Sequence, residues 1–245
     1  MRTLLGERYA PITTSVGFLH LGLDESVRAL ESWRRRLYDE VKVTELAAGF
    51  PEVLHRLEPL VGGARPRELL VEVAGGWTAY FDCGLQGTDA VSAIGHLASA
   101  IPCSGLVIMA APHTLGRRGL RHGQYGSVQF ELFGPNATYF LNYVRSIVVA
   151  HDGSRWIFET SGQVQPFEEP EAYRSRRIRD RFTSSMLERY CRALGVDPFN
   201  EAAYGPRAVL IESSVVIPAD GYIMTLQQVQ DWLEIVPGLA EGLPG

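Results

Sequence analysis

Apolar and polar positions in the first quarter of the chain follow two different periods. Residues 15–23 alternate apolar side chains with small or polar ones, which predicts a strand. Four large apolar residues then recur at helical spacing and predict an amphipathic helix over 25–38, with the arginine run 34–36 on its solvated outer face. The next apolar stretch, 43–61, contains two prolines, so we expect it to form short helical pieces.

Two pairs of β-rich runs, each interrupted by a short turn, predict β-hairpins. The first joins 68–73 to 77–82 through a Gly-Gly pair, and the second joins 147–150 to 155–159 through Asp152-Gly153. Each second strand begins with a tryptophan close to the turn, and each hairpin is followed by a linker and a helix. A weak internal duplication of a hairpin–helix unit would explain this similarity. Chance similarity is the alternative, and it is favoured because hairpins are common.

The same patterns predict the other elements. In chain order we expect a helix from Thr88 or Asp89 to Ile101, a central strand at 106–111, an exposed loop at 112–126, strands at 128–133 and 143–150, a helix at 178–194, a strand at 207–213 and a capped helix from Thr225.

Strands outnumber helices, and most of them can pair with a neighbour in sequence. The expected fold class is therefore α+β, with a mainly antiparallel sheet built from hairpins and helices packed on one face. The length of 245 residues fits a single domain, 1–245. A division into two lobes, 1–112 and 127–245, joined by the basic loop, stays open.

Composition is that of a globular protein, with 46% apolar and 21% charged residues. The net charge of −5 argues against binding nucleic acid through the overall field of the protein. Lys42 is the one lysine among 23 basic residues. A GC-rich bacterial genome explains this preference for arginine; the alternative is a set of anion-binding guanidinium groups.

Cysteine usage and the distribution of apolar residues indicate a protein that stays in the cytoplasm. Cys83, Cys103 and Cys191 are odd in number and form no CxxC pair, which is typical of reduced thiols. We find no signal-peptide core near the N-terminus and no apolar run long enough to cross a membrane. We therefore expect no membrane association.

Short catalytic signatures are absent. The chain has no GxxxxGK[ST], GxGxxG, HExxH, GxSxG or EF-hand loop, so the enzyme classes that carry them are removed. None of the six histidines has a second histidine three or four residues away on a predicted helix. We therefore expect no metal site and no cofactor.

The segment 77–89 carries the densest set of candidate residues. Trp77 and Tyr80 are candidate binding residues on opposite faces of the strand. Asp82 at the strand end and Asp89 at the helix start would share a proton or bind a metal if their carboxylates converged. Strand packing, a turn-stabilising aspartate and an N-cap aspartate are the alternative.

The loop 112–126 supplies a second set of candidates. His113 and His122 bracket it and would act as acid and base if the loop folded back on itself. Two exposed loop histidines are the alternative.

Two arginine patches are candidate anion-binding surfaces. One lies in the loop and the other in 174–181, at the start of the expected helix; their members are Arg117, Arg118 and Arg121, and Arg174, Arg176 and Arg177. If adjacent, they would bind a phosphate or an acidic partner surface; otherwise they are solvated surface. Cations at a helix N-terminus oppose the helix dipole, which favours a functional role for the second patch.

Two segments of the chain have a familiar composition and order. WTAYFDCGLQGTDAVSAIGHLA, followed later by QPFEEPEAYRSRRIRDRFTSSMLERYCRALGVDPF, resembles uncharacterised bacterial proteins of the kind found as immunity partners of polymorphic toxins. The resemblance contains no diagnostic motif, so no functional residue is carried over from it. It implies a cytoplasmic, non-catalytic protein that binds and blocks a toxin domain.

Three functions follow from these observations. The leading hypothesis is an intracellular protein-binding module of the immunity type with a toxin-like protein partner. The second is an enzyme acting on a small anionic substrate, with acid–base groups and an arginine clamp drawn from Asp82, Asp89, His113, His122, Arg117, Arg118 and Arg121. Nucleic-acid binding through 174–181 is the weakest, because no aromatic residues that stack on bases are interleaved with its arginines.

Overall fold

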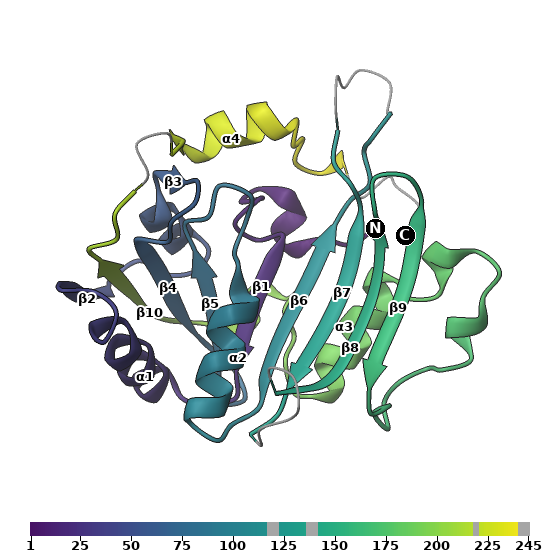
Figure 1. Cartoon of the computed structure of the whole chain (residues 1–245), viewed down its shortest axis with the longest axis horizontal. Coiled ribbons are helices and arrows are strands. Elements are labelled where there is room, and N and C mark those ends of the chain that lie inside the picture. Colours follow the sequence, from purple (N-terminus) through teal and green to yellow (C-terminus); the bar gives the residue numbers. More distant parts are fainter. Residues whose placement is uncertain (117–122, 136–141, 218–220, 240–245) are drawn as a thin grey trace.

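A nine-stranded antiparallel sheet forms the centre of the part of the chain that the computed structural model describes, residues 1–116, 123–135, 142–217 and 221–239 (Figure 1). Its strands, in spatial order, are β2 (Val41–Leu46), β10 (Tyr204–Ser213), β4 (Arg67–Val73), β5 (Trp77–Asp82), β1 (Ser15–Leu19), β6 (Gly105–Ala111), β7 (Ser127–Phe133), β8 (Tyr143–His151) and β9 (Trp156–Gly162). Two short strands, β3 (Leu60–Val61) and β11 (Ile223–Met224), pair separately. The predicted α+β class with a mainly antiparallel sheet is confirmed.

Both predicted hairpins are present. β4 pairs with β5 through a turn in which Gly75 and Gly76 have φ of 77° and 79°, a conformation that favours glycine. β8 pairs with β9 from His151↔Trp156 outward, and the Asp152 carboxylate accepts the backbone N–H groups of Ser154 and Arg155 in the turn. The helices that follow the two hairpins lie on opposite faces of the sheet, so the two hairpin–helix units pack differently.

Helices cover both faces of the sheet, where we expected one. α1 (Leu23–Arg35) and α2 (Ala90–Ala100) pack on one face, in front of the sheet in Figure 1. The other face is covered by α3 (Ser184–Ala193), α4 (Leu226–Leu233) and the 3₁₀ segments η1 (Leu4–Glu7) and η2 (Glu52–Leu57). The reason is that central strands such as β5, whose six residues are all buried, need cover on both sides: Trp77, Ala79 and Phe81 pack into one core, and Tyr80 packs into the other.

Two glycines set how closely α2 approaches the sheet. A Cβ at Gly17 of β1 or at Gly105 of β6 would lie 2.5 Å and 2.6 Å from side-chain atoms of Ile94. Both distances are shorter than carbon atoms tolerate. The absence of side chains at these positions therefore lets α2 lie directly on β1 and β6.

Two expected elements differ in the structure. Residues 41–46 form the edge strand β2 rather than a helical piece, because they pair with β10 from the far end of the chain. The expected helix 178–194 is helical only as α3, because Thr183 caps it and accepts the N–H of Met186 (3.3 Å). Residues 174–181 therefore precede the helix, in and around the 3₁₀ turns η3 (Ala172–Arg174) and η4 (Ile178–Asp180), and the argument from the helix dipole does not apply to them.

The sheet draws strands from both sides of the basic loop. β6 precedes the loop and β7 follows it, yet they pair over seven residues. β10, near the end of the chain, lies between β2 and β4. One sheet thus contains strands from both segments, 1–112 and 127–245.

A buried ion pair joins α1 to the sheet. Both carboxylate oxygens of Glu68, a residue only 1% exposed, accept hydrogen bonds of 2.6 Å from Arg34. The Tyr80 hydroxyl donates a third hydrogen bond to Glu68 (2.7 Å). The Arg34 guanidinium also lies 3.9 Å from the centre of the Trp33 ring. The arginine run 34–36 is therefore only partly a solvated face, because its first member points inward.

We expect Arg34→Met to lower the free energy of unfolding by about 3–5 kcal/mol, because it leaves the Glu68 carboxylate buried without its cation. Arg35→Met is the matched control. Arg35 is exposed and pairs with Glu31 one turn away, so its loss should cost about 0.5 kcal/mol or less. Urea unfolding monitored by circular dichroism measures both. Equal effects of the two substitutions would contradict a structural role for the buried pair.

Candidate functional site

Asp82 is buried at the end of β5, where it fixes the loop that leads to α2. Its Oδ1 accepts the N–H of Gly84 (2.8 Å), and its Oδ2 accepts the N–H of Asp89 (2.9 Å). Arg65 Nε lies 3.1 Å from Oδ1, an ion-pair distance, although the direction of its N–H does not fit a hydrogen bond. The Thr88 hydroxyl completes the group by accepting the N–H of Asp82 and donating to the carbonyl of Ile12.

The two aspartates of segment 77–89 meet through backbone rather than through their carboxylates. Asp89 offers Asp82 its N–H, while the Asp89 side chain is exposed and makes no capping hydrogen bond. In the described ranges, no group of three or more His, Cys, Asp or Glu side chains is arranged to hold a metal ion. The geometry therefore supports a turn-stabilising role for Asp82.

Burial dominates the acidity of Asp82. It raises the pKa of the carboxyl to about 6 and outweighs Arg65 and the two backbone N–H groups, all of which lower it. The Asp82 carboxyl therefore changes its protonation state near pH 6, and the stability of the fold changes with it.

Trp77 and Tyr80 lie inside the molecule. Trp77 is 3% exposed and stacks on His20 with ring centroids 4.6 Å apart. Tyr80 is 1% exposed and donates to Glu68. Both side chains stabilise the sheet from within and are not available to a partner, which corrects their assignment as binding residues.

His113 has a histidine neighbour that the sequence did not reveal. Its ring lies 4.7 Å from that of His151 and 5.1 Å from that of Trp156, while Tyr125 stacks on His151 at 5.4 Å. Arg179 lies 5.4 Å from the centre of the Trp156 ring. We call these five residues the imidazole cluster. His122, the predicted partner of His113, lies outside the described residues.

Backbone N–H groups orient both imidazoles. Gly126 donates to His113 Nδ1, and Gly153 donates to His151 Nδ1, each at 3.2 Å. A neutral ring that accepts at Nδ1 carries its proton on Nε2, so both rings keep an N–H donor. His151 and Trp156 flank the four-residue turn 152–155 of the second hairpin and face each other in its register. That register was the signal in the sequence that could have identified His151.

The segment that carries Arg179 is anchored by a second buried ion pair. Arg145, on β8, donates to both carboxylate oxygens of Glu168 (2.9 and 2.7 Å), and both side chains are almost completely buried. The hydroxyl of Tyr173 donates to the same carboxylate (2.8 Å). These bonds fix the chain next to β9, where Arg181 lies over Phe158 as Arg179 lies over Trp156.

The base of the basic loop and the segment 174–181 meet at Trp156, through His113 on one side and Arg179 on the other. Arg174 pairs with Glu171 and Arg177 with Asp180, both on the surface. Arg176 is exposed and has no ion-pair partner in the part of the chain that the structure describes. Arg117, Arg118 and Arg121 lie outside the described residues.

Exposed large apolar residues gather at the same end of the molecule. They belong to the loop and to the C-terminal segment: Leu115, Tyr125, Tyr222, Ile223, Trp232 and Val236. A pocket of about 470 Å³ lies between Tyr222, Trp232 and the backbone around Gly62. Gly123 donates to the Glu234 carboxylate (2.8 Å), which ties the loop to the end of α4.

We call this surface the loop end: the imidazole cluster, the described ends of the loop 112–126, β11 and α4. Figure 1 shows α4 and the described ends of the loop along the top of the sheet. No helix of the described residues is long and apolar enough to cross a membrane.

The raised pKa of Asp82 predicts a pH dependence of stability. The protonated carboxyl is favoured in the folded chain. Its stabilising contribution is therefore complete below the ordinary pKa of 3.8 and is lost as the pH rises through about 6. Arg65→Gln removes a cation that lowers this pKa, so we expect the pKa of Asp82 to rise above about 6. Carbon-13 NMR of the carboxyl measures it, with exposed Arg56→Gln as the control; an unchanged pKa in Arg65→Gln would contradict the ion pair.

The lowered pKa of His113 predicts that stability depends on pH in the opposite direction. Burial, the nearby His151 and Arg179 lower its pKa below the ordinary 6.5. The unfolded chain therefore takes up a proton before the folded chain does, and stability falls as the pH drops below 6.5. We expect His151→Gln to raise the pKa of His113, as followed by proton NMR of the imidazole ring. An unchanged pKa of His113 in His151→Gln would show that the rings do not interact.

Comparison of the chain with protein-family models, with curated proteins and with solved structures finds no match.

Proposed function

We propose that this chain is a protein-binding module whose partner docks on the loop end. The observation that carries the proposal is that exposed tyrosine, tryptophan and aliphatic side chains belong to elements that lie along one end of the sheet (Figure 1). Contiguous exposed apolar residues are typical of protein-interaction surfaces. Tyrosine, tryptophan and arginine are the residue types that most often dominate binding energy, and the imidazole cluster places Tyr125, Trp156 and Arg179 together.

The charge around the imidazole cluster selects an acidic partner. Arg155 is exposed next to Trp156 in the chain, and Arg179 lies within the cluster. Further arginines follow in the sequence of the loop at 117–121. Opposite charge on the partner would speed association and disfavour other proteins. A partner with an acidic, partly apolar surface fits this end.

The partner that we propose is a toxin domain, with the chain acting as its immunity protein in the bacterial cytoplasm. The resemblance of segments 77–98 and 165–199 to immunity-type proteins supports this assignment. Cys83, Cys103 and Cys191 form no disulfide, which is compatible with a reducing compartment.

A second function is supported by the pair of imidazoles. An enzyme acting on a small anion would use His113 and His151 as acid and base and Arg179 as the cation. Asp82 and Asp89 would not take part. No hydrogen bond, ion pair or ring contact within the described ranges joins either aspartate to His113 or His151.

The docking surface is tested by capturing the partner with matched variants. The triple variant Tyr125→Ala, Tyr222→Ala, Trp232→Ala removes three exposed aromatic side chains of the loop end. The control, Leu37→Ala with Val164→Ala, removes exposed apolar side chains elsewhere. From an extract of the organism that encodes the chain, we expect the wild type and the control to recover one stoichiometric protein. We expect the triple variant to bind it at least about 30-fold more weakly in calorimetry, equivalent to about 2 kcal/mol.

Two results would contradict the proposal. Equal affinity of the triple variant and the control would place the docking surface elsewhere, and failure to recover any stoichiometric protein would remove the partner. Expression of the captured protein alone and together with the chain then tests the immunity role. Growth arrest that the chain relieves supports it, and unchanged growth in both cultures argues against it.

A further inference from the structure

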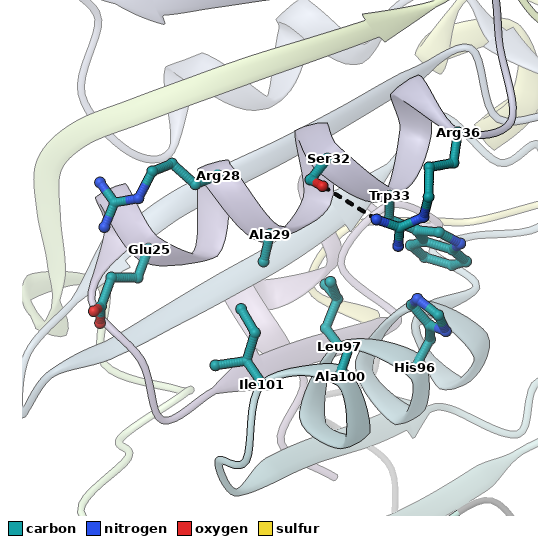
Figure 2. A pocket seen from close by; sticks show the side chains of 10 residues that line it. All are labelled: Glu25, Arg28, Ala29, Ser32, Trp33, Arg36, His96, Leu97, Ala100 and Ile101. Carbon is teal, nitrogen blue, oxygen red and sulfur yellow. Dashed lines mark hydrogen bonds between the residues drawn. The ribbon is translucent and has the colours of Figure 1, made fainter.

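A groove separates α1 from α2 on the face of the sheet that these helices share. Figure 2 shows the side chains that line it, and its volume is about 400 Å³, within the range of small-molecule sites. In that view its lower wall is formed by Leu97 and Ala100 of α2 and by Ile101, which follows the helix. Ala29 of α1 faces this wall. The small alanine side chains leave the space open. In Figure 1 the two helices lie in front of the sheet, away from α4 and the loop.

An aromatic stack closes one end of the groove. The rings of Trp33 and His96 are stacked, with centroids 4.1 Å apart and an angle of 24° between their planes. Nε2 of His96 is removed from solvent and has no hydrogen-bond partner in the described residues. Buried polar atoms in proteins are nearly always hydrogen-bonded, so this nitrogen lacks a partner that the surrounding residues do not supply.

An arginine without an acidic partner lies beside the same stack. Arg34 pairs with Glu68 and Arg35 with Glu31, but Arg36 has no carboxylate within ion-pair distance among the described residues. Its guanidinium donates to the Ser32 hydroxyl (3.1 Å), which holds it over the mouth of the groove, next to Trp33 and above His96 (Figure 2). A held guanidinium presents parallel N–H groups that match the two oxygens of a carboxylate.

We propose that the groove binds a small organic carboxylate, with its oxygens on the Arg36 guanidinium and its apolar body against Ala29, Leu97 and Ala100. His96 Nε2 is covered in the free chain, so the carboxylate reaches this nitrogen by displacing the side chains that lie over it. With its proton on Nε2, the imidazole donates to one carboxylate oxygen, and Arg36 donates to both. One guanidinium and one imidazole supply hydrogen-bond donors for the two oxygens of a single carboxylate. A phosphate would leave oxygens without donors, because Arg28 lies at the opposite end of the groove, beside Glu25. The site is independent of the loop end.

The probe for this site is 2-naphthoate, an apolar body with one carboxylate. Calorimetry on the full chain should show saturable 1:1 binding. The neutral 2-naphthamide should bind at least about tenfold more weakly, because it lacks the charge-assisted hydrogen bonds. Nitrogen-15 NMR should show that the Nε2 resonance of His96 shifts with 2-naphthoate and not with the amide.

Three variants locate the binding. Arg36→Gln should weaken 2-naphthoate binding about tenfold, whereas Arg35→Gln, which alters the neighbouring arginine paired with Glu31, should leave it unchanged. Ala100→Leu fills the groove from an exposed helix position without changing charge, so it should abolish binding while the unfolding midpoint stays near that of the wild type.

Absence of saturable 2-naphthoate binding, or binding that Arg36→Gln and Ala100→Leu leave intact, would overturn the proposal. Tighter binding of 2-naphthyl phosphate than of 2-naphthoate would overturn the assignment to carboxylates.

Discussion

Burial of β4, β5, β1 and β6 on both faces is the constraint on which the rest of the structure depends. Apolar side chains on one side of these strands pack into one core, and Leu19, Leu70, Tyr80 and Val107 on the opposite side pack into another, so each face needs its own cover. α1 and α2 supply one cover, and α3, α4 and the 3₁₀ segments supply the other. The second face also carries buried polar side chains, such as Glu68, Thr78 and Asp82, which must be satisfied internally, as the Glu68 carboxylate is by Arg34 and Tyr80.

The positions of the groove and of the loop end follow from where the helices cover the sheet. Two helices share one face of the sheet without filling the space between them, and the groove that contains Arg36 and His96 results. The turns and loops at one end of the sheet are tied together by Gly123 and Glu234, and by the stacking around Trp156. The surfaces that we propose for binding therefore lie at the loop end and between α1 and α2, whereas Trp77, Tyr80 and Asp82 of the segment 77–89 are buried.

Local patterns predicted local structure well. The Gly-Gly turn of the first hairpin, the turn at Asp152-Gly153 and the capping box formed by Thr225 and Gln228 are all present.

Non-local pairing was not predictable in the same way. β2 was read as helical because its partner, β10, is far away in the sequence. Helical spacing from Ile178 onward concealed the cap at Thr183, because Ile178 in the 3₁₀ turn η4 and Phe182 after it continue the four-residue spacing of α3. For the candidate site, the sequence identified His113, but its contact with His151 arises only when two hairpins lie side by side. Trp77 and Tyr80 attracted attention for their chemistry, and burial on both faces of β5 explains why neither is accessible.

Hydrogen exchange followed by mass spectrometry, on the chain alone and bound to its captured partner, tests the central claim most directly. Exchange should be slowest in β4, β5, β1 and β6 in both states. Binding should add protection at Gly123–Gly126, the β8–β9 turn and α4, and leave α1 and the β2 edge unchanged. Protection gained instead at the β2 edge or over α1, with none at the loop end, would contradict the account.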